Sequence, residues 1–237
     1  MTRVDFQCLI PNNEVHSNIL MLAALKTIIA QRAFDKTFEE ISDKITIWSL
    51  PPQFGIDALN SDISRQVVFE KYKDFWMPKS SALKYIYVPF IDDIFHWFLM
   101  VVFIDEGEVY KLDSYPNPDR DISKNFVMRW TLELLNYILC SPYSATKVLE
   151  NKDLPIDNWP FNKARGIPDC KTSDDSPIWL LKWMAMEDMF QSNLTTRPPD
   201  AQIRMLAACA NLTGNHNEIC HIVKNHSAAR RKALVGN

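Results

Sequence analysis

The sequence is poor in glycine and lacks any long apolar run. It contains 5 glycines against 14 prolines, a balance that argues against flexible linkers and low-complexity segments. The most apolar stretch near its N-terminus, residues 19–25, ends at Lys26 and falls far short of the roughly 20 residues that span a bilayer. We therefore expect no membrane-spanning helix and no membrane partner.

An excess of positive charge is lacking as well. The formal net charge is -3, whereas domains that bind nucleic acids usually carry a clear basic excess, so we expect no nucleic-acid partner. Apolar residues make up 47% of the chain and charged residues 23%, which is typical of a globular protein with one substantial core. We predict a single domain over residues 1–237, with an N-terminal helical region at 1–44 and a C-terminal helical tail at 210–237.

The cysteines show no paired spacing that would indicate a disulfide framework. An odd, scattered set fits a reducing compartment, and the N-terminus lacks the basic-then-apolar pattern of a secretory signal. These two features predict a protein of the nucleus or cytoplasm. The cysteines are Cys8, Cys140, Cys170, Cys209 and Cys220.

Signatures of bound cofactors and metals are also missing. The chain has no glycine-rich loop that could hold a phosphate, so we predict no cofactor. One group near the C-terminus has helical spacing but no paired cysteines, and a solvated helix end explains it better than a metal site. That group consists of His216, Cys220, His221 and His226.

The apolar pattern that is present predicts an α+β fold with a central antiparallel sheet flanked by helices. A nearly continuous apolar run at residues 96–104 predicts a strand covered on both faces, which a turn at 105–108 joins to the next strand. A loop rich in Pro, Asn and Asp is expected at 154–175. The predicted strands are 44–50, 85–89, 96–104 and 109–113, and the predicted helices are 17–34, 64–75, 123–140, one from 176 and one from about 200.

A histidine and an aspartate stand at the two ends of this predicted hairpin. Asp113 follows His96 by seventeen residues, which is the length of a strand, a tight turn and a returning strand. The hairpin can therefore place the imidazole and the carboxylate side by side, as a base and the group that orients it in a catalytic triad. On spacing alone, such a pair is more often structural than catalytic.

Several motifs in this region resemble those of the proteases specific for ubiquitin-like proteins, the SUMO deconjugases. The resemblance extends over about residues 45–210 and implies a papain-like cysteine-protease fold. Two of the motifs are similar to plant and transposon-borne branches of that family: Trp48–Pro51 and Trp76–Pro78. The others are Tyr87–Pro89, His96–Val102, Lys111–Ser114 and Ile178–Met184.

The sequence departs from the family pattern at the nucleophile. Alignment back from Ile178 places Ser176 at the position of the family's catalytic cysteine and Pro177 at that of the following glycine. The same alignment places Cys170 where the family has its oxyanion-hole glutamine. The resemblance therefore implies that His96 and Asp113 are retained as the catalytic pair, while the nucleophile and the oxyanion donor are replaced.

These replacements predict a protease-like domain with little or no peptidase activity. A serine hydroxyl is much harder to ionise than a thiol, and loss of one oxyanion-hole donor costs about 10²–10³ in rate. A structural role for Ser176 is also expected, because serine followed by proline is a preferred helix start, with the serine as the cap.

The resemblance implies a partner, namely a SUMO-type ubiquitin-like protein or its conjugates, bound through its Gly-Gly tail. Trp97 matches the tryptophan that covers this tail in the family, and Trp48 is a candidate second groove residue, although a core role for both is open. One alternative is an active deSUMOylating isopeptidase that uses His96 and Asp113, with Ser176 as a functional or engineered replacement or with Cys170 as a relocated nucleophile. A second alternative is a drifted scaffold or interaction module.

Overall fold

The computed structural model describes residue 8 and residues 14–35, 45–141, 149, 152, 154–164, 167 and 175–184. The predicted C-terminal tail, the helix expected from about residue 200 and the histidine–cysteine group near the C-terminus lie outside the described residues. None of the helices within the described ranges is long and apolar enough to cross a membrane.

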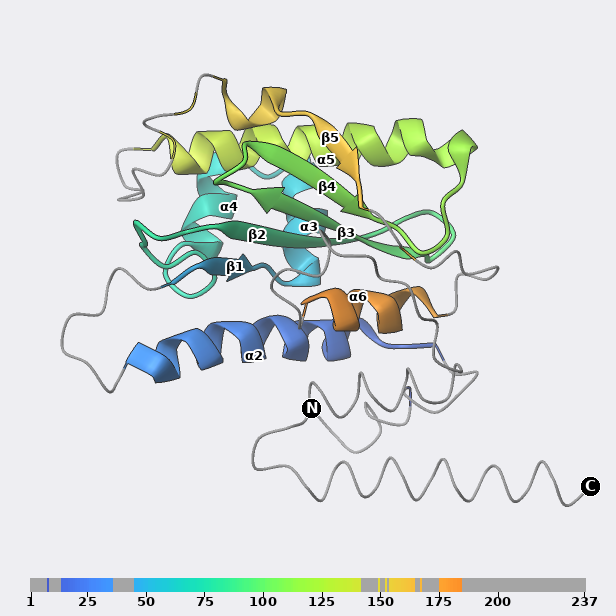
Figure 1. The fold of residues 1–237 in the computed structure, drawn as a ribbon, viewed down its shortest axis with the longest axis horizontal. Helices are drawn as coiled ribbons and strands as arrows, with labels where there is room; N and C mark the ends of the chain where they lie inside the picture. Colours follow the sequence, from blue (N-terminus) through green and yellow to red (C-terminus); the bar gives the residue numbers. More distant parts are fainter. Residues whose placement is uncertain are drawn as a thin grey trace, which may run out of the picture.

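A five-stranded mixed sheet forms the centre of the fold (Figure 1). The three middle strands are antiparallel, as predicted, but each edge strand runs parallel to its neighbour, so the prediction of an antiparallel sheet is wrong at both edges. The reason is that helices separate each edge strand from its partner along the chain, and such crossovers permit parallel pairing. In sheet order, the strands are β1 (Ile47–Ser49), β2 (Tyr85–Ile91), β3 (Trp97–Phe103), β4 (Glu108–Leu112) and β5 (Phe161–Lys163).

Helices cover both faces of this sheet (Figure 1). On one face lie α2 (Ser17–Asp35) and α6 (Ser176–Met184). The other face is covered by α3 (Pro52–Leu59), α4 (Arg65–Tyr72) and α5 (Pro118–Leu139), and the short 3-10 helix η1 (Ile156–Asn158) packs beside α5. This arrangement confirms the predicted α+β class.

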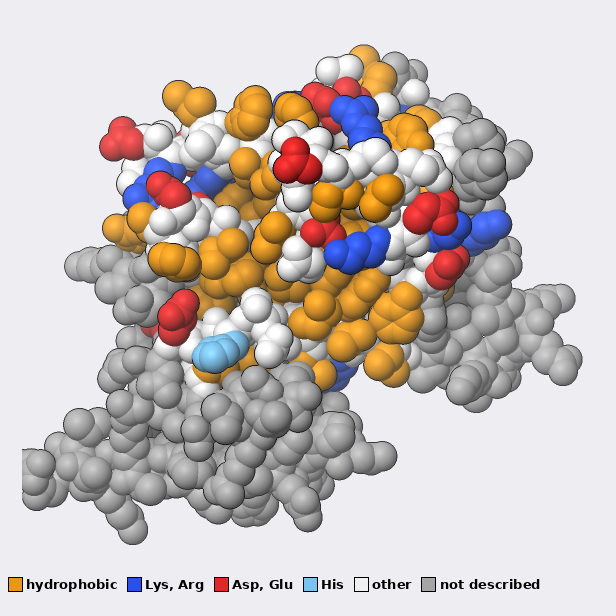
Figure 2. Space-filling view, turned by 180° about the vertical axis from the view of Figure 1, so that it is seen from behind, with side chains coloured by type: hydrophobic (Ala, Val, Ile, Leu, Met, Phe, Trp, Pro, Cys, Tyr) orange, Lys and Arg blue, Asp and Glu red, His pale blue; other side chains and the backbone are white. Residues whose placement is uncertain are grey.

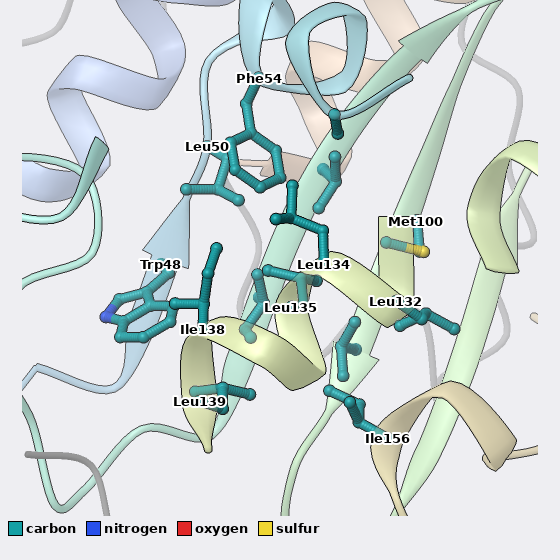
Figure 3. Close-up of a cluster of buried hydrophobic side chains, with 14 of the residues drawn as sticks. Trp48, Leu50, Phe54, Met100, Leu132, Leu134, Leu135, Ile138, Leu139 and Ile156 are labelled. Atoms are coloured by element: carbon teal, nitrogen blue, oxygen red, sulfur yellow. The ribbon is translucent and has the colours of Figure 1, made fainter. Parts of the chain in front are cut away.

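The central strand β3 is buried along its whole length and divides the core into two clusters. Because side chains alternate across a strand, Leu99 and Val101 face α2 and α6, while Met100 and Val102 face α3, α4 and α5. The second cluster is shown in Figure 3, where Leu50, Phe54 and Leu135 lie close together over the sheet. Burial on both faces explains the continuous apolar run of this strand.

Two helices differ from the sequence prediction at proline residues. Helix α5 begins five residues earlier than predicted, because Asn117 caps it by accepting from the Asp119 N–H and Pro118 occupies its first turn. The sequence does not predict helix α3, because Pro51 and Pro52 indicate the end of a strand, whereas in the structure Pro51 caps the helix and Pro52 begins it. Proline is tolerated in the first turn of a helix, where its missing N–H has no intrahelical partner to lose.

Large hydrophobic side chains remain on the surface of the described part. Seen from the side opposite to Figure 1, hydrophobic side chains spread over the middle of the face, with charged side chains among and around them (Figure 2). On α5, Ile122, Phe126 and Trp130 are exposed at intervals of four residues, while Met128, Leu132 and Leu135 are buried. Helix α5 thus packs one apolar side against the sheet and exposes a second apolar side to solvent.

This division of α5 generates a stability prediction. Leu135→Ala removes a fully buried side chain and is expected to lower the free energy of unfolding by about 2–5 kcal/mol. Ile122→Ala on the same helix removes an 81% exposed side chain and should stay within about 0.5 kcal/mol of the wild type. Urea unfolding followed by circular dichroism measures both, and equal losses would contradict the core described above.

Candidate active site

His96 and Asp113 lie side by side at one end of the β3–β4 hairpin. His96 directly precedes β3, Asp113 directly follows β4, and the register pairs Leu99 with Leu112. His96 Nε2 lies 2.7 Å from Asp113 Oδ1, and both side chains are buried. The predicted juxtaposition is confirmed, while a catalytic role for the pair remains a prediction.

The turn between β2 and β3 holds the backbone of His96 in place. Asp92 Oδ1 accepts hydrogen bonds from the N–H of Ile94 at 3.1 Å and from that of His96 at 2.9 Å. Between them, Phe95 has a φ of 60°, a left-handed conformation that is unfavourable for a bulky residue, and its side chain is 71% exposed. Asp92 therefore stabilises a strained turn directly before the histidine.

A buried lysine from α5 completes the cluster. Lys124 Nζ donates to Asp113 Oδ2 at 2.6 Å, lies 3.5 Å from Asp92 Oδ2 and stands over the Phe98 ring. Sequence reasoning missed this residue. A signal existed, because Lys124 occupies the same side of α5 as the buried Met128, and a lysine on a core-facing side needs a charged partner.

Asp113 is held as a carboxylate by its surroundings. Burial by itself raises the pKa of this carboxyl, because it disfavours the charged form. Hydrogen bonds from His96 and Lys124, the positive charge of Lys124 and the Tyr115 N–H outweigh burial, so the pKa lies well below its ordinary value. Asp113 therefore stays ionised at neutral pH and can orient the imidazole.

Ser176 lies at the start of α6, against the first residue of β3. Its Oγ accepts a hydrogen bond from the backbone N–H of Trp97 at 2.9 Å, and the side chain is fully buried. The Asp175 carbonyl accepts from the N–H groups of Ile178 and Trp179, so Asp175 occupies the cap position. The prediction that Ser176 caps α6 is therefore wrong, because a tertiary contact with the sheet engages its hydroxyl.

The second ring nitrogen of His96, Nδ1, differs from Nε2 in its surroundings. Nδ1 is buried and has no hydrogen-bond partner among the residues that the structure describes. Since Nε2 faces the Asp113 carboxylate, the neutral ring carries its proton on Nε2, and Nδ1 is left as an acceptor. The cluster therefore offers one acceptor nitrogen for a donor group or for general-base chemistry.

The other predicted site residues differ in their placement. Trp97 is 6% exposed and packs in the cluster beneath α2 and α6. Trp48 is 1% exposed, lies in the opposite cluster and donates its indole N–H to the Pro78 carbonyl at 3.0 Å, which favours its core role over a groove role. Cys170 lies outside the described residues. Within the described ranges, no three His, Cys, Asp or Glu side chains gather as a metal site would require.

The lowered pKa of Asp113 generates a prediction for acid stability. A carboxyl with a depressed folded-state pKa contributes stability that is present above its unfolded pKa of about 3.9 and is lost as the pH falls toward the folded-state pKa. Asp113→Asn removes this contribution. Between about pH 6 and pH 3, the variant should lose roughly 1 kcal/mol less unfolding free energy than the wild type. Urea unfolding at both pH values measures this, with the exposed Asp105→Asn as control, and equal losses in wild type and Asp113→Asn would refute it.

A protein-family model matches the sequence of this chain. The family model described as the Ulp1 protease family, C-terminal catalytic domain, matches residues 60–195. The comparison with curated proteins gives no match.

Solved structures of SUMO proteases share the fold. A SUMO protease Ulp1 whose catalytic cysteine is oxidised to a sulfinic acid has 14% identity and a TM-score of 0.59, over 94% of this chain and 84% of that one. The C-terminal Ulp1 protease domain in complex with Smt3, the yeast ortholog of SUMO, has 16% identity and a TM-score of 0.52, over 88% and 80%. The Ulp1-like SUMO protease catalytic domain of Chaetomium thermophilum has 16% identity and a TM-score of 0.53, over 86% and 76%.

Identities this low show the fold, while the family match extends over more than half of the chain. The fold is that of the Ulp1-like proteases, and the chain belongs to the Ulp1 protease family, C-terminal catalytic domain.

Proposed function

We propose that this chain is a SUMO-protease-like domain that binds a ubiquitin-like protein and has little or no peptidase activity. The observation that carries the proposal is the identity of residue 176 and the hydrogen bond that its side chain makes. A serine stands at the position that the resemblance assigns to the nucleophile, and its oxygen accepts a hydrogen bond from the Trp97 amide. Trp97 directly follows His96, which keeps its contact with Asp113.

The chemistry of the nucleophile supports an impaired site. A solved relative has a catalytic cysteine, whose thiol an adjacent imidazole can ionise, whereas a serine hydroxyl stays protonated in the same setting. The hydrogen bond from the Trp97 N–H also engages one of the two lone pairs of the Ser176 oxygen and lowers its nucleophilicity. Pro177 and Cys170, at positions where the family has glycine and glutamine, are further departures from a working cysteine-protease site.

The proposed partner is a SUMO-type ubiquitin-like protein, in the nucleus or cytoplasm. A relative of this fold has been solved in complex with Smt3, which supports a binding surface of the same kind here. We place the Gly-Gly tail along the strand end that carries His96 and Trp97, next to the exposed ring of Phe95. The motifs at Trp48–Pro51 and Trp76–Pro78 support a place in the plant or transposon-borne branch of the family.

An active isopeptidase is the second candidate. The 2.7 Å contact between His96 and Asp113 orients the imidazole, and its Nδ1, unpartnered among the described residues, supplies the acceptor that a general base requires. Ser176 or Cys170 would then act as the nucleophile. An assay of turnover distinguishes the two candidates, and an assay of binding separates both of them from a drifted scaffold.

The first prediction concerns turnover. With SUMO carrying a fluorophore on its C-terminal Gly-Gly, we expect the native chain to release no more fluorophore than His96→Ala, because neither chain can form a thiolate at position 176. An active cysteine-type SUMO protease serves as the positive control. Release by the native chain that is lost in His96→Ala would refute the impaired site and establish the isopeptidase.

The second prediction concerns binding. SUMO ending in Gly-Gly should bind at least about tenfold more tightly than SUMO lacking these two residues, because the tail is placed at the His96 end of the sheet. Calorimetry with the native chain measures both dissociation constants.

Phe95→Ala should weaken this binding without a loss of fold. Leu154→Ala is the matched control, since Leu154 is also exposed but lies near Trp159 and the β3–β4 turn, at the other end of the hairpin. Absence of binding by either form of SUMO would overturn the proposed partner and leave the scaffold alternative.

A further inference from the structure

Helix α5 is apolar on the side that faces away from the sheet. A helix on the surface of a globular protein normally carries polar and charged side chains there. On α5 this outward line consists of Ile122, Phe126, Trp130 and Tyr137, which are 81%, 63%, 41% and 38% exposed. The rings of Phe126 and Trp130 lie 6.1 Å apart between their centroids. A helix that is apolar on both sides is typical of one that is also covered on both sides.

The outward line is symmetric about Phe126. Ile122 lies four residues before it and Trp130 four residues after it, which is about 6 Å along the helix axis in each direction. Residues four apart lie on the same side of a helix, so the three side chains form one continuous strip. A strip of this kind can pair with an antiparallel copy of itself, because reversing its direction exchanges its two ends and keeps its centre in place.

We propose that the outward line of α5 is the contact surface of a homodimer, in which α5 of a second copy of this chain packs antiparallel on it. In a two-fold contact, residue i of one copy meets residue j of the other, and j meets i. A two-fold axis at Phe126 places this ring against the ring of the second Phe126. The same axis places Ile122 against the second copy's Trp130 at both ends of the strip.

The charges at the two ends of the line complement each other across this axis. Asp119 lies seven residues before Phe126, is exposed and forms no ion pair among the described residues. Glu133 lies seven residues after Phe126 and pairs at 3.0 Å with Arg65, whose side chain is 52% exposed. The axis therefore brings Asp119 to the Arg65–Glu133 pair of the second copy, where the guanidinium can bind both carboxylates. The uncharged centre of the line meets its copy without burying a charge.

The exposed apolar area of the line fits a weak, reversible dimer. A whole aromatic side chain has about 150–250 Å² of surface, so the exposed fractions of the four outward side chains amount to several hundred Å². A standard interface buries about 800 Å² per partner, of which a little over half is apolar. The line therefore supplies the apolar part of an interface at the small end of this range, for which we expect a dissociation constant in the micromolar range.

The first test is the mass of the full chain in solution. One chain has a mass of 27.5 kDa. In sedimentation equilibrium, the average mass should rise from that of one chain near 1 μM to that of two chains near about 200 μM. The mass of a single chain over this whole range would overturn the inference. Dimerisation adds stability only as the concentration approaches the dissociation constant, so the small effect expected for Ile122→Ala applies to dilute protein.

A pair of variants tests the position of the contact. Phe126→Asp places two carboxylates at the axis and should raise the dissociation constant of the dimer at least about tenfold. Ile29→Asp is the matched control, because Ile29 is 56% exposed but belongs to α2 on the opposite face of the sheet. Both replaced side chains are exposed, so circular dichroism should show a retained fold. An unchanged dissociation constant in Phe126→Asp, or an equal rise in both variants, would overturn the inference.

Cysteine cross-linking tests the two-fold axis itself. Phe126→Cys faces its own counterpart and should form a disulfide between copies on oxidation with copper–phenanthroline. In Ile122→Cys the two introduced cysteines are about 12 Å apart along the helix axes, beyond the reach of about 7 Å between Cα atoms, and should not cross-link. The native chain, with its exposed Cys140, is the blank. No cross-link in Phe126→Cys, or equal cross-linking in Ile122→Cys, would contradict an axis at Phe126 and overturn the inference.

Discussion

The register between β3 and β4 determines where the site forms. Leu99 lies opposite Leu112, and continuing this register places Asp113 opposite Phe98, two residues from His96. The hydrogen bonds of Asp92 and Lys124 then complete the approach of the imidazole and the carboxylate. A slip of one residue would exchange the two faces of β3 and move its buried side chains to the wrong cluster, which both packed layers oppose. The same packing that stabilises the fold therefore fixes the distance between the imidazole and the carboxylate.

The buried charges around this pair compensate one another. An isolated carboxylate in the core is costly, and so is an isolated ammonium, but Asp113 and Lys124 meet at 2.6 Å and satisfy each other. Removal of Lys124 leaves Asp113 with the hydrogen bonds of His96 and the Tyr115 N–H, and removal of Asp113 leaves Lys124 with Asp92 at 3.5 Å. This ion pair gives the carboxylate a role in the fold in addition to any role in chemistry.

The extent to which the sequence predicts this arrangement follows from the range of each interaction. The spacing of His96 and Asp113 identified the hairpin pair, because a hairpin is local and its length can be counted. Ser64 was predicted as the start of α4 and caps it, since a cap is also local. Strand β5 was missed because three residues in a polar stretch form a strand only by pairing with β4. The role of Ser176 was misassigned for the same reason, since its partner Trp97 is 79 residues away in the chain.

That distant contact also has a consequence for the motion of the site. Trp97 is the first residue of the central strand β3. Its amide donates a hydrogen bond to the side chain of Ser176, at the start of α6 and far along the chain. Whenever α6 lifts from the sheet, this amide loses its acceptor and becomes available to solvent. The hydrogen-exchange rate of the Trp97 amide therefore reports the docking of α6. The exchange rates of the other amides in β3 report the unfolding of the sheet, so the two events can be measured separately. A single backbone proton beside His96 in this way reports whether the two halves of the site are assembled.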